Sequence, residues 1–218
     1  YKLAATSTWT TFADGTSTAT STTVTSLTNG SAYDFRVSAT NAVGTGTVSA
    51  MASATPATTP GTPTSLAATK GNTQVSLTWS APVSDGGDAI TDYVIEYKLA
   101  ATSTWTTFAD GTSTATSTTV TSLTNGSEYD FRVSATNTVG TGSTSSTASA
   151  TPSTTPGTPS SLSATAGSGQ VGLSWSAPSS GGSAITDYTI EYKLSTDSSW
   201  TTFSHGASTA TSITVTGL

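Results

Sequence analysis

The sequence predicts an all-β protein made of tandem β-sandwiches, one complete and two partial. Two observations support this class. Apolar residues alternate with polar ones over short runs, which is the pattern of half-buried strands, and no helical periodicity of useful length interrupts them. The chain also repeats itself, because residues 1–31 recur unchanged as residues 97–127. A repeat of about 96 residues is too long for a solenoid and suits an independent domain.

Proline-rich segments mark the joints between the repeated units. Ala54–Leu66 and Ala150–Leu162 are equivalent, and each holds three prolines, which favour an extended, semi-rigid connector. We therefore expect the second half of a domain in residues 1–56, a complete domain in residues 57–152 and the N-terminal part of a third in residues 153–218. The chain is expected to be a window on a longer array.

Four runs of the complete unit predict strands, in the order "QVSLTWS", "DYVIEYK", "STTVTSL" and "EYDFRVSA". Their expected inward side chains are Val75, Leu77 and Trp79; Tyr93, Ile95 and Tyr97; Val120 and Leu123; and Tyr129, Phe131, Val133 and Ala135. Turn signals such as "TNGS" and "NTVGTG" separate the runs. The segment "APVSDGGDAI" loses one residue in the third unit, so we expect a loop there. Short strands in about 95 residues indicate an all-β sandwich.

The unit resembles a fibronectin type III domain, an immunoglobulin-like β-sandwich. The resemblance rests on the early Pro63, the "WSAP" segment from Trp79 to Pro82, the segment Asp85–Tyr97 and the segment Leu123–Gly142. It covers the whole unit and recurs in both partial units. A domain of this family implies a tyrosine corner, in which the hydroxyl of Tyr129 bonds the backbone near the preceding leucine.

The same corner is implied for Tyr33 in the first unit, near Leu27. Together with the strand patterns, the resemblance predicts a set of structural residues: Trp79, Tyr93, Ile95, Leu123, Tyr129, Phe131, Val133, Trp175, Tyr33 and Phe35. Their expected work is folding. The family by itself does not fix a function.

Composition and charge narrow the function classes. The net charge is −6 and no basic cluster is present, so a nucleic-acid footprint is not expected. No long apolar run suggests membrane insertion. Cysteine is absent, which excludes disulfides and thiolate metal sites. His205 is the only histidine and sits where the other units have Asp14 and Asp110, on a turn, so a Ser/His/Asp triad is not expected. We expect no enzyme activity, catalytic residue or cofactor.

Three other groups of residues have two interpretations each. Asp85, Asp88 and Asp92 surround a Gly-Gly turn, and carboxylate oxygens suit calcium, but the third unit has Ser183 in place of Asp88. We therefore favour a polar loop and expect no metal. Asn29 and Asn125 begin Asn-Gly-Ser sequons, which fit either N-glycosylation or a tight turn. A bound glycan is a further expectation that this pattern leaves open.

The third group is a recurring tryptophan in the "TWTTF" or "SWTTF" segments: Trp9, Trp105 and Trp200. An exposed aromatic row binds sugars in some proteins, whereas alternation of Trp105 with Phe108 favours packing against the core or at its edge. We favour packing.

The leading hypothesis is a non-catalytic structural or adhesive repeat module of a long, bacterial-like, secreted or cell-surface protein, part of a filament or surface layer. Edge strands are usually guarded by lysine, proline or bulges, and here only six residues are Lys or Arg. We therefore expect self-association, through sandwich edges or end to end with neighbouring chains. The alternative is a spacer array in a secreted polysaccharide-degrading enzyme or carbohydrate-binding protein.

Overall fold

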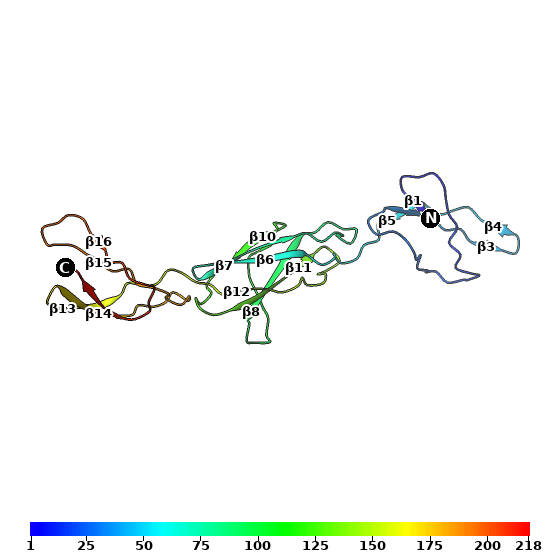
Figure 1. Ribbon diagram of the computed structural model, residues 1–218. Coiled ribbons are helices and arrows are strands. Elements are labelled where there is room, and N and C mark those ends of the chain that lie inside the picture. Colours follow the sequence, from blue (N-terminus) through cyan, green and yellow to red (C-terminus); the bar gives the residue numbers. More distant parts are fainter.

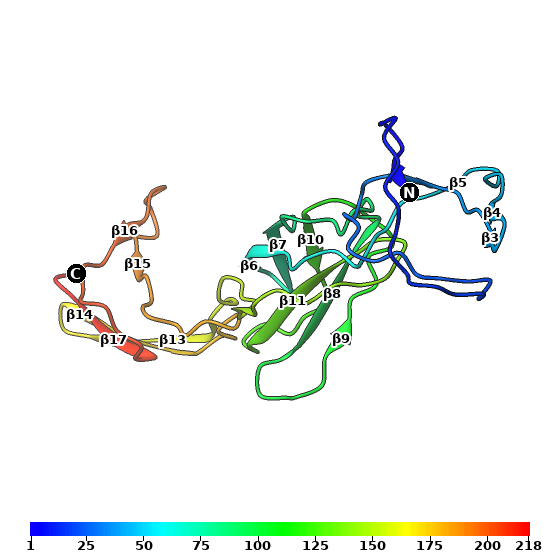
Figure 2. The same cartoon turned by 90° about the vertical axis from the view of Figure 1, so that its right-hand side faces the viewer.

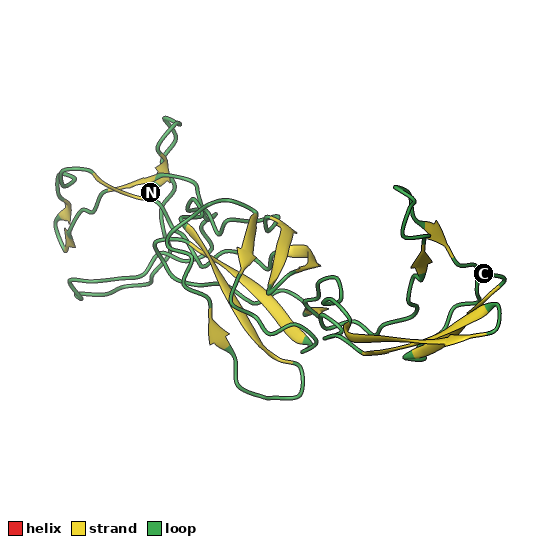
Figure 3. Ribbon diagram, turned by 90° about the vertical axis from the view of Figure 1, so that its left-hand side faces the viewer, coloured by secondary structure: helices red, strands yellow, loops and turns green.

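The computed structural model describes residues 1–218 and contains strands, turns and loops only, so the predicted all-β class is confirmed. No helix that could cross a membrane is found. Three units follow one another along an elongated molecule, with the first in blue, the central unit in cyan to green and the last in yellow to red (Figure 1). Figure 3 shows how much of each outer unit is loop.

The central unit is a sandwich of two antiparallel sheets. One sheet has the order β10 (Ser117–Val120), β7 (Gln74–Ser80) and β6 (Thr64–Gly71). The other has the order β12 (Ala148–Ala150), β11 (Tyr129–Thr136), β8 (Asp92–Leu99) and β9 (Thr106–Thr107). The long strands β8 and β11 run side by side (Figure 2). The chain therefore crosses between the sheets after β7, β9 and β10, which brings residues from both ends of the unit together.

The pairing of β8 with β11 explains how alternation in the sequence becomes a core. The register runs from Tyr129 opposite Leu99 to Thr136 opposite Asp92. Because side chains alternate between faces along a strand, Val133 and its partner Ile95 share the inner face. Both are essentially inaccessible to solvent. Their neighbours in the sequence therefore form the outer face.

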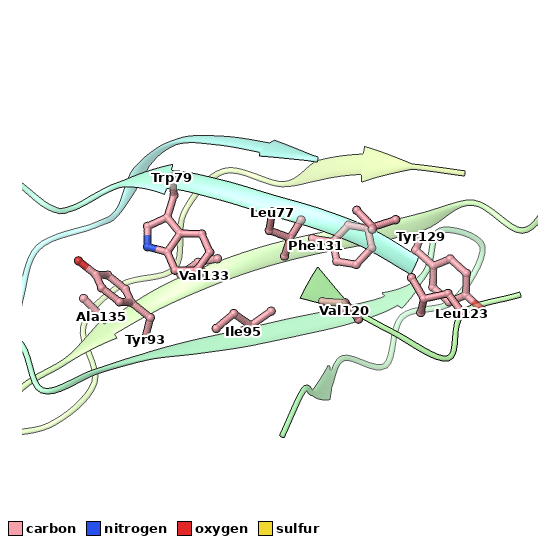
Figure 4. Packing of buried hydrophobic residues seen from close by; sticks show 11 residues of the cluster. Leu77, Trp79, Tyr93, Ile95, Val120, Leu123, Tyr129, Phe131, Val133 and Ala135 are labelled. Atoms are coloured by element: carbon pink, nitrogen blue, oxygen red, sulfur yellow. The ribbon is translucent and has the colours of Figure 1, made fainter. Parts of the chain in front are cut away.

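The core lies between the two sheets (Figure 4). Its buried members are Val75, Leu77, Trp79, Tyr93, Ile95, Val120, Leu123, Tyr129, Phe131, Val133 and Ala135. Each fully buried large side chain, Leu77 and Phe131 among them, contributes about 1.5–3 kcal/mol relative to an exposed one. The sheets hold eleven side chains between them, which suits a small single sandwich.

One core contact recurs in two units and involves a polar atom. The Nε1 of Trp79 is buried without a hydrogen-bond acceptor, and the ring lies edge-on to Tyr93 with 5.3 Å between centroids. In Figure 4 the indole nitrogen lies on the side of Trp79 that faces Tyr93. Trp175 and Tyr188 repeat the arrangement at 5.1 Å, also with an unpaired Nε1. The electron-rich ring face is a weak acceptor for such an N–H group.

The first unit is a partial copy of this sandwich. Its strands are β1 (Lys2–Leu3), β2 (Tyr33–Phe35), β3 (Thr40–Asn41), β4 (Gly44–Thr45) and β5 (Ala52–Ala54). They form the sheet β1-β2-β5 and the hairpin β3-β4. No second sheet covers them: Val37 is 71% exposed, while the equivalent Val133 is fully buried. Phe35 is accordingly only half-buried.

The third unit contains the earlier part of the sandwich, equivalent to residues 57–123 of the central unit. Its strands are β13 (Ser160–Gly167), β14 (Gln170–Ser176), β15 (Glu191–Tyr192), β16 (Thr201–Thr202) and β17 (Ser212–Thr216). They form the sheet β13-β14-β17 and the pair β15-β16. Trp175 is half-buried here, whereas Trp79 is only 6% exposed, because residues 153–218 do not include the segment equivalent to β11.

The segment that loses a residue lies outside any strand, in a loop before β8. The hydrogen bonds identify the residue. Gly61 N donates to Ser84 O at 2.8 Å, and Gly157 N donates to Ser179 O at 2.9 Å. Ser84 and Ser179 are therefore equivalent, which leaves Val83 as the extra residue. Val83 is fully exposed, so its loss removes no packing.

Candidate functional site

The tyrosine corner connects the two sheets of the central unit. Tyr129 is 8% exposed, and its hydroxyl accepts a hydrogen bond from Thr124 N at 3.2 Å. Leu123, buried just before the turn, donates its N–H to Thr73 O at 2.9 Å. The crossing from β10 to β11 is thus held both by a phenol and by the β6–β7 turn. The first unit repeats the corner, with 3.1 Å between Tyr33 Oη and Thr28 N.

The outer face of the four-stranded sheet carries cross-strand ion pairs. Lys98 lies opposite Asp130, with 2.6 Å between Nζ and Oδ2, and Arg132 lies opposite Glu96, with 2.8 Å between Nε and Oε2. Such directly opposed charges stabilise a sheet modestly. The Lys98 ammonium and then the Ser149 hydroxyl, which donates to Oδ1 at 2.6 Å, lower the pKa of the Asp130 carboxyl below its ordinary value.

Tryptophan side chains lie over these ion pairs. The Trp105 ring has the guanidinium of Arg132 4.2 Å from its centroid and the ammonium of Lys98 5.3 Å away. Trp9 repeats this, with Arg36 at 3.9 Å and Lys2 at 5.6 Å. A cation over the ring occupies the flat face that a sugar would stack on. This geometry favours packing over sugar binding at both positions.

The sequence predicted packing of Trp105 at the core or at its edge, but not the face of the sheet on which it packs. Phe108 packs against the core cluster, as alternation suggested, but Trp105 lies on the opposite, outer face. The missed signal is the pair of outward cations on neighbouring strands, Lys98 and Arg132, which only the β8–β11 register brings under one ring. Trp200 has only Lys193 nearby, at 5.5 Å, and is 61% exposed.

The three aspartates around the Gly-Gly turn, two in the loop and Asp92 at the start of β8, bind different backbone groups. Asp85 Oδ1 accepts from Gly87 N at 2.8 Å, Asp92 Oδ1 accepts from Ser113 N at 2.9 Å, and Asp88 Oδ2 accepts from Thr138 N at 2.9 Å. The chain holds no cluster of three or more His, Cys, Asp or Glu side chains arranged to bind a metal. Each aspartate thus accepts a hydrogen bond from a different backbone segment and stabilises that segment, and the three do not converge on one point.

His205 is half-buried on its turn. Its Nε2 lies 2.9 Å from Tyr188 O and its Nδ1 lies 2.8 Å from Gly206 O. The ring also stacks on Phe203 with 6.2 Å between centroids. Both nitrogens face backbone carbonyls, so the ring links the segment around Gly206 to Tyr188, which lies shortly before β15.

The sequon asparagines lie in turns at the ends of their units. Asn125 Nδ2 donates to Asn72 Oδ1 at 2.8 Å, and Asn125 Oδ1 accepts from Thr73 N at 2.8 Å. This side chain therefore clamps the β6–β7 turn. Asn29 is exposed in the equivalent turn. Glycosylation of either residue stays a prediction.

A hollow of about 480 Å³ lies where the first and central units meet. Val83 is the only apolar residue among those lining it, and the rest come from the Asn29-Gly30-Ser31 turn, Thr58 and the Ser84–Gly87 turn. Small-molecule sites are mostly apolar with a few converging polar groups. We therefore describe the hollow as a groove between two turns, at the junction of the two units, and not as a ligand site.

Comparison with known proteins identifies relatives of these units. The family described as fibronectin type III domain matches residues 61–151 and 157–218, more than half of the chain. M-protein of striated muscle from Gallus gallus is 31% identical over 129 residues, which are 56% of this chain and 9% of that protein. The chain thus spans about a tenth of that relative's length.

Solved structures also align with the chain. One is a set of domains from titin, with 28% identity and a TM-score of 0.43, covering 48% of this chain and 36% of that one. Another is the twitchin kinase region from C. elegans, with 30% identity and a TM-score of 0.39, covering 41% of this chain and 16% of that one.

Proposed function

The chain belongs to the fibronectin type III domain family, and from this premise we propose that it serves as a structural segment of a longer array, holding other parts of its protein at a distance. Repeats of this domain are typical of non-catalytic structural modules. The chain is related to M-protein of striated muscle, of which it spans about a tenth.

The observation that carries the proposal is the head-to-tail succession of equivalent units along an elongated molecule (Figure 1). The polar side chains that most resembled functional groups, such as Asp88, Asn125 and His205, each bind a turn or loop of their own unit. These contacts support folding of each unit. The proposed function therefore rests on the repetition of the units. Repetition supplies reach and multivalency.

We further propose that neighbouring chains associate through sandwich edges. The edge strand β6 bears exposed Thr64, Ala67 and Thr69, and its only charged residue is Lys70. An edge strand presents unpaired backbone N–H and C=O groups, and charges are the usual protection against pairing. A weakly protected edge supports lateral contacts between copies.

The setting of the array is also a proposal. We propose a secreted or cell-surface location, in a filament or surface layer, from the weakly charged composition, which leaves strand edges free for lateral contacts. The likeness to M-protein favours a second setting, a filament scaffold of the muscle type. The bacterial-like character expected from the sequence has no counterpart among the reported relatives, which include Gallus gallus and C. elegans proteins. Immunogold labelling of source cells distinguishes the two settings.

Electron microscopy of the native material tests assembly. We expect ordered fibres whose axial repeat matches one or two units. Thr69→Lys on the edge of β6 should abolish them, while Thr112→Lys in an exposed loop adds the same charge and should leave them intact. Equal loss in both variants would show a general charge effect and refute edge pairing. Isolated flexible beads from the parent chain would refute assembly altogether.

A further inference from the structure

Consecutive units meet through glycine backbone at both joints. At the first joint the Asn29-Gly30 turn lies against Gly87 of the next unit, and a Cβ built on Gly30 would lie 3.0 Å from Gly87 Cα. At the second joint a Cβ built on Gly126 would lie 3.2 Å from Gly182 Cα. A Cβ on Gly87 would overlap Gly30 N. The two backbones therefore approach as closely as they do only because no side chain stands between them.

The linker is bonded to both units within three residues. At the first joint Gly30 N donates to Pro56 O at 2.9 Å, and Thr58 N donates to Gly86 O at 3.0 Å. Only Ala57 separates the residue held by the upstream unit from the residue held by the downstream unit. A linker with a single unattached residue has little freedom to bend.

The second joint repeats these bonds at equivalent residues. Gly126 N donates to Pro152 O at 2.9 Å, and Thr154 N donates to Gly181 O at 2.8 Å. The repetition holds although the loop carrying the Gly-Gly turn is one residue shorter in the third unit. The missing Val83 lies before the turn, so the turn itself and its contact are preserved.

We propose that the Asn-Gly turn and the following Gly-Gly turn form a built interface between successive units, which fixes their relative orientation and gives the array the same step at every joint. The partner of each turn is the neighbouring unit of the same chain. The Pro-rich segment then acts as part of this interface and not as a free tether. This inference goes beyond the proposed function, because a fixed joint is compatible with an array of any role.

A pair of spin labels measures the step directly. The chain contains no cysteine, so Val43→Cys and Val139→Cys would carry the only labels. These valines occupy equivalent hairpins in the first and central units and are 97% and 51% exposed. Pulsed electron paramagnetic resonance on the full chain then reports the distance between units. We expect one narrow distance distribution.

Gly87→Ala is the decisive variant, and Gly111→Ala is its matched control. Both glycines have positive φ, +84° and +78°, so both substitutions carry the same backbone strain, but a Cβ on Gly111 meets nothing within 4 Å. Gly87→Ala should broaden the distance distribution about twofold, because relative domain motion is the default once an interface is lost. Gly111→Ala should leave it narrow.

Two results would overturn the inference: a broad distribution in the parent chain, or an unchanged narrow one in Gly87→Ala. Amide spectra of β7, β8 and β11 verify that the central unit stays folded. Should Gly87→Ala unfold it, Gly30→Ala probes the same contact from the first unit and should broaden the distribution equally. Failure of the edge-pairing test leaves this result standing, since the labels report on single chains.

Discussion

Tyr129→Phe tests the tyrosine corner by removing one oxygen atom. The ring and its packing remain, while Thr124 N loses the acceptor that lies 3.2 Å away. A typical hydrogen bond contributes about 0.5–1.5 kcal/mol, and a buried donor left unpaired costs about 1–3 kcal/mol. Thr124 is itself exposed, so water partly replaces the phenol. We therefore expect the central unit to lose about 1–1.5 kcal/mol, close to a tenfold shift in its unfolding equilibrium.

Native-state hydrogen exchange on the full chain measures this loss unit by unit. Core amides of β11, such as those of Phe131 and Val133, should exchange about tenfold faster through global opening. Tyr97→Phe is the control, because Tyr97 is half-buried on β8 and its hydroxyl has no hydrogen-bond partner in the protein. Equal acceleration in Tyr129→Phe and Tyr97→Phe would refute the reasoning, because the cost would then follow ring polarity and not the corner bond.

Two further predictions concern the outer face of the same sheet. The Lys98 hydrogen bond lowers the pKa of Asp130, so its stabilisation is fully present above the ordinary value of 3.8 and is lost as pH falls through the folded-state pKa. Denaturant titrations should therefore show Asp130→Asn destabilised at neutral pH and converging with the parent in acid; a constant gap would contradict the ion-pair account. A double-mutant cycle of Trp105→Ala and Arg132→Met should give a coupling of about 0.5–1 kcal/mol, and additive effects would exclude the stacking as a source of stability.

The sequence predicted the residues on the inner faces of the strands better than the contacts on the outer faces. Alternation alone placed Leu77 and Phe131 inside, because burial follows a period of two and needs no knowledge of the partner strand. The contacts of Trp105 could not be predicted in this way, because its partners come from two other strands and the sequence does not give the register between them. The family resemblance suggested a phenol-to-backbone bond near Leu123, and the phenol of Tyr129 bonds the next residue, Thr124.

The joints were the least predictable part of the molecule. Proline content indicated an extended connector, but contacts between Gly30 and Gly87 involve backbone atoms, which carry no sequence pattern beyond the glycines themselves. Glycine-containing turns also occur in places without any neighbour, as at Gly111. Only the folded arrangement distinguishes a glycine that is needed for its turn from one that is also needed for an approach.

The short linkers bear on how such an array responds to mechanical load. A chain pulled from its ends first straightens whatever slack its connectors hold, but here Pro56 and Thr58 are already bonded to the units on either side. Little length is stored at the joints, so tension passes early to the first and last strands of each unit, β6 and β12 in the central one. Large extension then requires whole units to unfold, and forced unfolding is governed by the unfolding rate. An array of this kind would yield in steps, one sandwich at a time.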